Sequence, residues 1–235
     1  MARISGNLAI YVWDYPDVHR ADQTRTEVAA AARRLAAEGL LIGTAGNVSA
    51  PVPGTDLRAV TATGVVLSEC GPEHVTVVDT NGTVVEGEFA PTSELGLHLS
   101  LHDRGAVVHT HAPWSTAIAC VLDSLPVLHY QQLSLGGEVA VAPYATFGTA
   151  ELAANVTAAL AGRQAALLAN HGSVAIGSEL GRAVDNALLL EWLCQLHHRA
   201  SALGQPRVLD TDQQRAVVEQ AINLKYGDTR PAGEQ

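Results

Sequence analysis

The spacing of hydrophobic and polar residues predicts both strands and helices along this chain of 235 residues. Short stretches rich in valine are typical of β-strands, because β-branched residues fit a pleated, half-buried surface. Longer stretches of alanine, leucine and charged residues that stop at glycine are typical of helices. We expect strands within residues 57–63, 75–79, 83–87, 105–112, 138–144, 164–172 and 173–177. We expect helices within residues 22–38, 113–120, 149–160, 179–203 and 211–224, and another after Pro91 with Thr92 or Ser93 as its cap.

Strands interspersed with helices predict an α/β fold, in which a central mixed, largely antiparallel β-sheet is flanked by helices in a single domain. We place this domain at residues 21–227, and Thr-Asn-Gly at residues 80–82 predicts a hairpin turn within it. Residues 1–20 concentrate aromatic side chains and contain Pro16, and we interpret them as an extended N-terminal arm. Residues 228–235 are interpreted as a mobile C-terminal tail.

Composition narrows the class of protein. Hydrophobic residues make up 47% of the chain and charged residues 16%, which excludes a disordered protein. No apolar run approaches the ~20 residues that span a bilayer, and the N-terminus lacks the pattern of a signal peptide, so we expect no membrane partner. The net charge of −10 argues against nucleic acid and, taken alone, against anionic substrates. Three widely spaced cysteines are typical of a reducing compartment, so we expect a cytoplasmic protein.

The string Val-Val-His-Thr-His at residues 107–111 carries the most specific chemistry. Residues i and i+2 of a strand point to the same face, so His109 and His111 can chelate one cation. Neutral imidazoles suit zinc or a related transition metal. His171 follows another apolar run and precedes Gly172, so it too is expected at a strand end. Three histidines with an open fourth position are typical of a catalytic zinc site, whereas the H-x-H pair alone fits two surface histidines equally well.

A second group of side chains competes for the metal. Glu94, His98 and His102 are spaced i, i+4, i+8 and would share one face of the helix predicted after Pro91. This stripe is the less favoured site, because an open coordination position and supporting hydrogen bonds would have to come from elsewhere. We interpret His98 instead as a histidine that packs between helix and sheet.

Eight short strings follow one another along the chain. They are GTAGNVS (43–49), TATG (61–64), PTSE (91–94), HTHA (109–112), HY (129–130), APYATFGT (142–149), NHG (170–172) and KYG (225–227). In this order they resemble the class II aldolase and adducin family, most closely its L-fuculose-1-phosphate aldolase branch. The resemblance covers residues 22–227, and the ordered set is specific although no single string is.

The resemblance implies a fold like that of class II aldolases, a metal site and a reaction. It makes His109, His111 and His171 the ligands of one Zn²⁺ per subunit, with Glu94 as catalytic base and as fourth ligand in the resting site. It implies a zinc-dependent aldolase acting on L-fuculose 1-phosphate or a related deoxyketose 1-phosphate. The products would be dihydroxyacetone phosphate and an aldehyde such as L-lactaldehyde.

The resemblance also implies the surroundings of the substrate. Tyr130 and Tyr226 are expected near the aldehyde, one of them from a neighbouring subunit, and Phe147 is expected to line the aldehyde pocket. The family pattern implies a homotetramer with sites at its interfaces. The residues that resemble the phosphate cradle of the family are Asn47, Thr63, Gly64, Thr92 and Ser93.

The lysine content bears on the mechanism. Retro-aldol cleavage leaves an enediolate, whose charge needs either a lysine Schiff base or a divalent metal. Lys225 is the only lysine and lies beside the predicted tail, which favours the metal. A phosphate held by amides, hydroxyls and a nearby metal needs no basic patch, so the net charge does not exclude a phosphorylated ketose.

Two other kinds of function are left open by the sequence. Epimerase, dehydratase and decarboxylase branches of the family share the histidines, although the epimerases typically carry aspartate where this chain has Glu94. A metal-free interaction module, as in the adducin branch, is disfavoured because that branch lacks the metal ligands.

Overall fold

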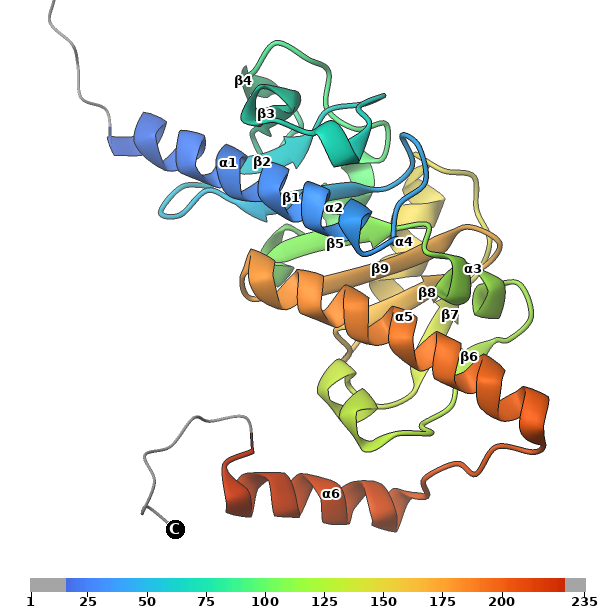
Figure 1. Ribbon diagram of the computed structural model, residues 1–235. Coiled ribbons are helices and arrows are strands. Elements are labelled where there is room, and N and C mark those ends of the chain that lie inside the picture. Colours follow the sequence, from blue (N-terminus) through green and yellow to red (C-terminus); the bar gives the residue numbers. More distant parts are fainter. Residues whose placement is uncertain (1–15, 227–235) are drawn as a thin grey trace, which may run out of the picture.

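Nine short strands form one mixed sheet in the described part of the chain (Figure 1). The computed structural model describes residues 16–226. The sheet order is β4-β3-β2-β1-β5-β9-β8-β7-β6, and every neighbouring pair is antiparallel except β7 and β8. The strands are β1 (Asn47–Pro51), β2 (Arg58–Thr61), β3 (Val75–Val78), β4 (Val84–Glu86), β5 (Ala106–Thr110), β6 (Ser124–Leu125), β7 (Val139–Ala142), β8 (Ala165–Leu168) and β9 (Gly172–Gly177).

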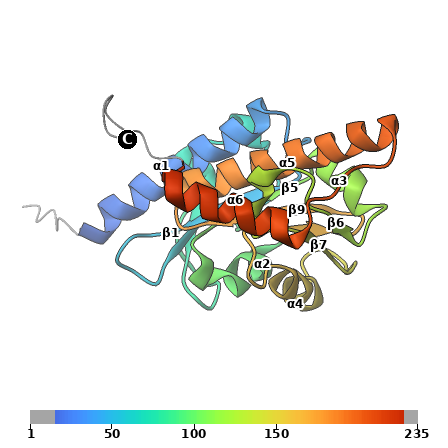
Figure 2. The ribbon, with the colours of Figure 1, turned by 90° about the horizontal axis from the view of Figure 1, so that it is seen from below.

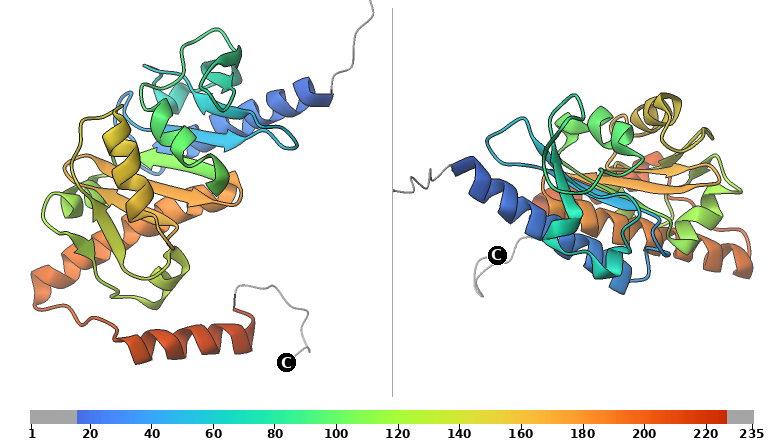
Figure 3. Two further views of the ribbon diagram at one scale, coloured as in Figure 1. Left: turned by 180° about the vertical axis from the view of Figure 1, so that it is seen from behind. Right: turned by 90° about the horizontal axis from the view of Figure 1, so that it is seen from above.

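Helices cover both faces of this sheet. They are α1 (Pro16–Ala37), α2 (Leu95–Ser100), α3 (Pro113–Ala119), α4 (Ala150–Ala159), α5 (Leu180–Leu203) and α6 (Thr211–Leu224). Figures 2 and 3 show the sheet between α1 and α5 on one side and α2 and α4 on the other. α6 lies outside these layers and contacts the 3-10 helix η4 (Tyr130–Leu135). The expected single α/β domain with a mixed, largely antiparallel sheet is confirmed.

The sheet separates two hydrophobic cores. Val108 on β5 and Ala175 on β9 pack with α1, α3 and α5, whereas Val107 and Ile176, their neighbours in sequence, pack with α2 and α4. This alternation follows from the period of two along a strand. His109 is two residues after Val107, so its side chain points to the same face as Val107, toward α2. Burial of each large aliphatic side chain contributes roughly 1.5–3 kcal/mol.

The local elements depart from expectation at the start of α2. The helix begins at Leu95 with Glu94 as its N-cap, and no side chain caps it. The expectation that Thr92 or Ser93 caps the helix is therefore wrong. The Thr92 hydroxyl instead accepts a hydrogen bond from the backbone N–H of Glu94 at 3.2 Å, which closes the turn before the helix. This turn places Glu94 directly before the first residue of α2.

The ends of the chain and one turn complete the comparison. α1 covers residues 16–21 ahead of the start expected at Asp22, and Pro16 is the first residue that the structure describes. The proposed arm thus overlaps α1 at residues 16–20. The rest of that arm and the tail at 228–235 lie outside the described residues. The turn at 80–82 is confirmed by the hydrogen bond from Asp79 N–H to the Thr83 carbonyl at 3.0 Å. No helix in the described part of the chain is long and apolar enough to cross a membrane.

Candidate metal centre and substrate cavity

Four side chains from three separate segments meet beside the central strands. His109 lies on β5, His111 follows that strand, His171 lies in the turn between β8 and β9, and Glu94 directly precedes α2. One ligand atom from each of the four lies within 4.8 Å of the others. The three imidazole rings pack edge to face with centroids 4.8–4.9 Å apart. Such a cluster has the size of a coordination sphere around a single cation.

The backbone at residues 170–172 explains how His171 reaches this cluster. Asn170 adopts a left-handed conformation with φ of 55°, which asparagine tolerates better than most residues. A side chain at Gly172 would place its Cβ 2.2 Å from the carbonyl oxygen of Thr110, so only glycine lets β9 begin this close to β5. Asn170 and Gly172 therefore allow a sharp turn of the chain. The side chain of His171, which lies between them in sequence, points toward the end of β5.

The hydrogen bond of Nδ1 of His109 leaves its Nε2 free to bind a metal. Its Nδ1 lies 2.9 Å from the carbonyl oxygen of Ser173, which can only accept, so Nδ1 carries a proton. Its Nε2 lies 3.0 Å from Nε2 of His111 and 3.1 Å from Oε2 of Glu94. Oε1 of Glu94 is buried, lies 3.6 Å from Nε2 of His171 and has no hydrogen-bond partner. Three nitrogen donors and a partly unpartnered carboxylate fit zinc or a related divalent transition metal.

The electrostatics keep these groups in their metal-binding forms. Burial, followed by the neighbouring His109 and His171, lowers the pKa of His111 to about 4. Burial and His109 also lower the pKa of His171. Burial alone would raise the pKa of Glu94, but hydrogen bonding and charge attraction from His109, with a hydrogen bond from Asn47, hold it well below its usual range. The site therefore favours neutral imidazoles at positions 111 and 171 and an ionised carboxylate at neutral pH.

The competing stripe of Glu94, His98 and His102 does not form a metal site. α2 ends at Ser100, and His102 lies in a separate 3-10 helix with an exposed side chain. His98 is fully buried and hydrogen-bonded to Ser49 and Asn47 on β1, which confirms its interpretation as a histidine between helix and sheet. Within residues 16–226, the group of Glu94 with three histidines is the one cluster of metal-binding side chains.

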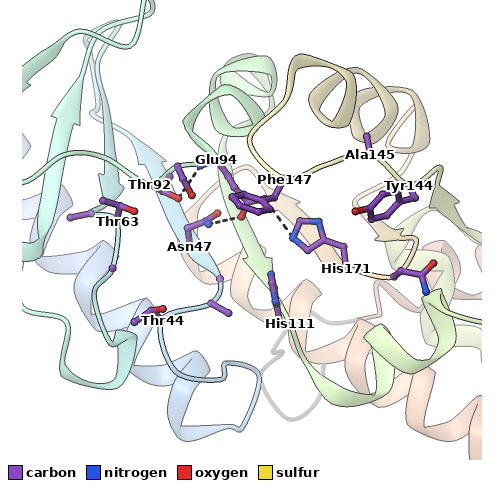
Figure 4. Close-up of a pocket in the computed structure, with 16 residues that line it drawn as sticks. Thr44, Asn47, Thr63, Thr92, Glu94, His111, Tyr144, Ala145, Phe147 and His171 are labelled. Carbon is purple, nitrogen blue, oxygen red and sulfur yellow. Dashed lines mark hydrogen bonds and ion pairs between the residues drawn. The ribbon is translucent and has the colours of Figure 1, made fainter.

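A cavity of about 440 Å³ opens beside the cluster (Figure 4). Figure 4 shows Asn47 and His171 reaching Glu94 from opposite sides, with Thr44 and Thr63 on one flank and Tyr144 on the other. The residues expected around the substrate that line this cavity are Asn47, Thr63, Gly64, Thr92, Ser93 and Phe147. Sequence reasoning missed Thr44, Tyr144, Ala145 and Asn170, which also line it. All four lie within the short strings that resemble the family, near residues that were predicted to line the site. Their position near those residues was the signal that could have identified them.

The two tyrosines expected near the aldehyde lie elsewhere in the single chain. Tyr130 on η4 and Tyr226 after α6 are both exposed, and their hydroxyl oxygens are 3.3 Å apart. This hydrogen bond raises the pKa of Tyr130. Both residues border a groove between η4, α5 and α6, and neither lines the cavity beside the histidines. Lys225 borders the same groove, so the lone lysine is also outside the cavity.

The family model of the class II aldolase and adducin N-terminal domain matches residues 26–198. The chain is 38% identical over 203 residues to the 5-methylthioribulose-1-phosphate/5-deoxyribulose-1-phosphate aldolase of Rhodospirillum rubrum, a match that covers 84% of this chain and 90% of the relative. It is 39% identical over 185 residues to the L-fuculose phosphate aldolase of Escherichia coli strain K12, covering 77% and 85%. The fold is similar to a solved L-fuculose 1-phosphate aldolase, with a TM-score of 0.80, 35% identity and coverage of 84% and 95%.

Proposed function

Because the chain belongs to the class II aldolase and adducin family and is a class II aldolase of sugar phosphates, we propose that it reversibly cleaves a deoxyketose 1-phosphate. The products are dihydroxyacetone phosphate and a short aldehyde. The candidate substrates are L-fuculose 1-phosphate, 5-deoxyribulose 1-phosphate and 5-methylthioribulose 1-phosphate, in keeping with the names of the two relatives. The observation that carries the proposal is the convergence of Glu94 and three histidines beside a cavity lined with hydroxyl groups.

The histidine cluster supports a metal-assisted cleavage. His109, His111 and His171 would hold one divalent cation, zinc in this proposal, with Glu94 as a fourth ligand in the resting site. The cation would stabilise the negative charge that carbon–carbon cleavage leaves on the donor fragment. Glu94 then transfers the proton of the donor carbon, because its unpartnered Oε1 can accept one and Asn47 holds its Oε2 at 3.0 Å.

The hydroxyl-lined flank of the cavity supports a phosphate subsite. Neither lysine nor arginine lines the cavity in the described residues, so neutral donors would hold the anion. Gly64 has φ of +73°, and a side chain there would meet no atom within 4 Å, so its backbone offers an open approach. The proposed phosphate contacts are Asn47, Thr63, Gly64, Thr92 and Ser93.

The opposite flank supports a short aldehyde with an apolar end. Phe147 is 65% exposed and Tyr144 is 63% exposed, and both line the cavity. Aromatic rings of this kind pack well against a methyl or methylthio group. We assign the protonation of the aldehyde oxygen to Tyr130 or Tyr226 from a neighbouring subunit of a homotetramer, since neither lines the cavity of its own chain.

The test is a product assay across the three ketose 1-phosphates, with elemental analysis of the same enzyme sample. We expect dihydroxyacetone phosphate, detected by a coupled reductase, from at least one of them and about one zinc per chain. The Glu94→Gln variant is the matched control, because it keeps the three histidines. Absence of triose phosphate from all three, with a product formed from another sugar acid phosphate, would instead favour an epimerase, dehydratase or decarboxylase.

A cytoplasmic location completes the proposal. Cys70, Cys120 and Cys194 are all unpaired in the structure, which suits a reducing compartment. Fractionation of the source cells, with the protein recovered in the same fraction as known cytoplasmic enzymes, would test it.

A further inference from the structure

A buried chain of polar side chains leads from Glu94 away from the three histidines of the metal cluster. It runs from Arg58 on β2 through Ser49 on β1, His98 on α2 and Asn47 on β1 to Glu94. The successive distances are 2.8, 2.7, 2.6 and 3.0 Å. All five residues are at most 6% exposed. Arg58, Ser49 and His98 do not line the cavity, and they have no role in the cleavage mechanism proposed above.

The two charged ends of this chain together determine the direction of each hydrogen bond. The guanidinium of Arg58 can only donate, so the Ser49 hydroxyl accepts from it, and the ionised carboxylate of Glu94 can only accept, so it faces the amide nitrogen of Asn47. The amide oxygen of Asn47 then faces Nε2 of His98, which carries the proton of the neutral ring and donates it. Nδ1 of His98 is left to accept the proton of the Ser49 hydroxyl. Reversal of any one bond would place two acceptors or two donors face to face.

The charges around His98 agree with this neutral form. Burial and the positive charge of Arg58 lower the pKa of His98 to about 3. Burial also lowers the pKa of Arg58 to about 10, so the guanidinium is charged at neutral pH. Arg58 is fixed independently of Ser49, because it also donates to the backbone carbonyls of His102 and Gly105 at 3.1 and 2.9 Å.

We propose that His98 is a positioning residue, which fixes the amide of Asn47 so that its nitrogen faces Glu94 and holds the carboxylate in place for proton transfer. Without the donor of His98 the amide can rotate and present its oxygen to the carboxylate, which repels it. A second N–H of the same amide stays free on the cavity side, since Asn47 lines the cavity. The Asn47 side chain thus connects the substrate to Glu94, and His98 sets the orientation of that side chain. The proposal rests on the aldolase function above.

The first experiment isolates the step that Glu94 carries out. Dihydroxyacetone phosphate is incubated with the metal-loaded enzyme in deuterium oxide without aldehyde, and loss of its carbon-bound proton is followed by NMR. We expect His98→Leu to slow the exchange by about 10- to 100-fold with a small change in KM, as is typical when a supporting hydrogen bond is lost. His98→Gln retains one acceptor and one donor, and we expect it to recover most of the rate. His102→Leu, an exposed histidine in the next short helix, is the matched control and should exchange like the wild type.

A double-mutant cycle separates positioning from packing. If His98 acts through Asn47, then His98→Leu in the Asn47→Ala background should slow exchange by less than about twofold. Equal losses in both backgrounds would overturn the proposal. If His98→Leu does not fold, Ser49→Ala takes its place in the cycle, because it removes the hydroxyl that donates to Nδ1 of His98.

The second experiment does not depend on activity. The ring proton of His98 is located by ¹⁵N NMR, with the signal assigned from its absence in His98→Gln. We expect the proton on Nε2 in the wild type and a larger share of the form with the proton on Nδ1 in Ser49→Ala. A proton on Nδ1 in the wild type would overturn the proposal. No exchange in a wild type with the Nε2 proton would instead refute the proposed donor substrate.

Discussion

The histidine cluster and the tyrosine pair are built in opposite ways. The cluster is assembled from α2, β5 and the β8–β9 turn, and the side chains of Glu94 and His109 are almost completely buried. The pair of Tyr130 and Tyr226 is exposed, and a single 3.3 Å hydrogen bond joins it. A single chain therefore completes the ligand set but leaves the expected aldehyde-side tyrosines outside the cavity.

The two regions therefore depend on different parts of the fold. The geometry of the cluster is determined by the sheet register, since His109 pairs with Val174 across β5 and β9 and with Asn47 across β5 and β1. The position of Tyr226 depends on α6, in which no residue is buried. Substitutions in the cluster should thus act within one chain, whereas under the proposed homotetramer substitutions of the tyrosines should act on the site of another chain.

The largest effect is expected for His109→Ala. Loss of this ligand leaves a buried carboxylate beside two histidines and removes a metal contribution of several kcal/mol to cleavage, so turnover should fall about 1,000-fold or more. Elemental analysis should show little bound metal. A variant with full metal occupancy and normal turnover would show that the cluster is not the metal centre.

Glu94→Gln should cause the next largest loss. The amide keeps the shape of the side chain but cannot accept the donor proton, so turnover should fall by about 100- to 10,000-fold, while three histidines keep the metal. Turnover and metal content are measured on one preparation. Wild-type turnover would remove Glu94 from the mechanism.

Tyr130→Phe should lower turnover by about 100-fold and leave metal content unchanged. If the tyrosine serves a neighbouring chain, subunits of this variant mixed with subunits of Glu94→Gln form some sites with both functional groups. Mixed assemblies should then regain activity that neither variant has alone. A mixture as inactive as either variant alone would contradict the assignment of Tyr130 to the site of a neighbouring chain.

The smallest effect is expected on the stability of the folded chain and comes from the buried His98 beside the cluster. The pKa of His98 is about 3 in the folded chain and about 6.5 when unfolded, so below pH 6.5 only the unfolded chain takes up this proton. The free energy of unfolding should therefore fall as the pH decreases from 6.5 toward 3, by up to about 1.4 kcal/mol per pH unit from this residue. Urea unfolding of metal-free protein at pH 7 and pH 5 should show a smaller pH dependence in His98→Gln than in the wild type. An identical pH dependence would contradict the burial of a neutral His98.

The sequence could predict features that depend on local periodicity. The period of two placed His109 and His111 on one face, and valine-rich stretches located most of the sheet. The strings that resemble the class II aldolases identified most residues lining the cavity, and membership of that family is confirmed.

Features that depend on contacts between distant elements were not predictable in this way. The start of α2 was misplaced because the Thr92 hydroxyl bonds the backbone of Glu94 instead of capping a helix. The path from Arg58 to Glu94 needs the register of β1 with β2 and the docking of α2, which no spacing in the sequence reveals. Tyr144 was overlooked because its string was interpreted only through Phe147.

The arrangement of the ligands also has a kinetic consequence. His111 and His171 come together only when β5 and β9 pair, after the intervening chain with β6, β7 and β8 has closed into a long loop. A folding chain must meet the entropy cost of that closure before it can capture a cation with all three histidines. Bound metal would then stabilise the paired state and not the open loop, so it should slow unfolding much more than it speeds folding.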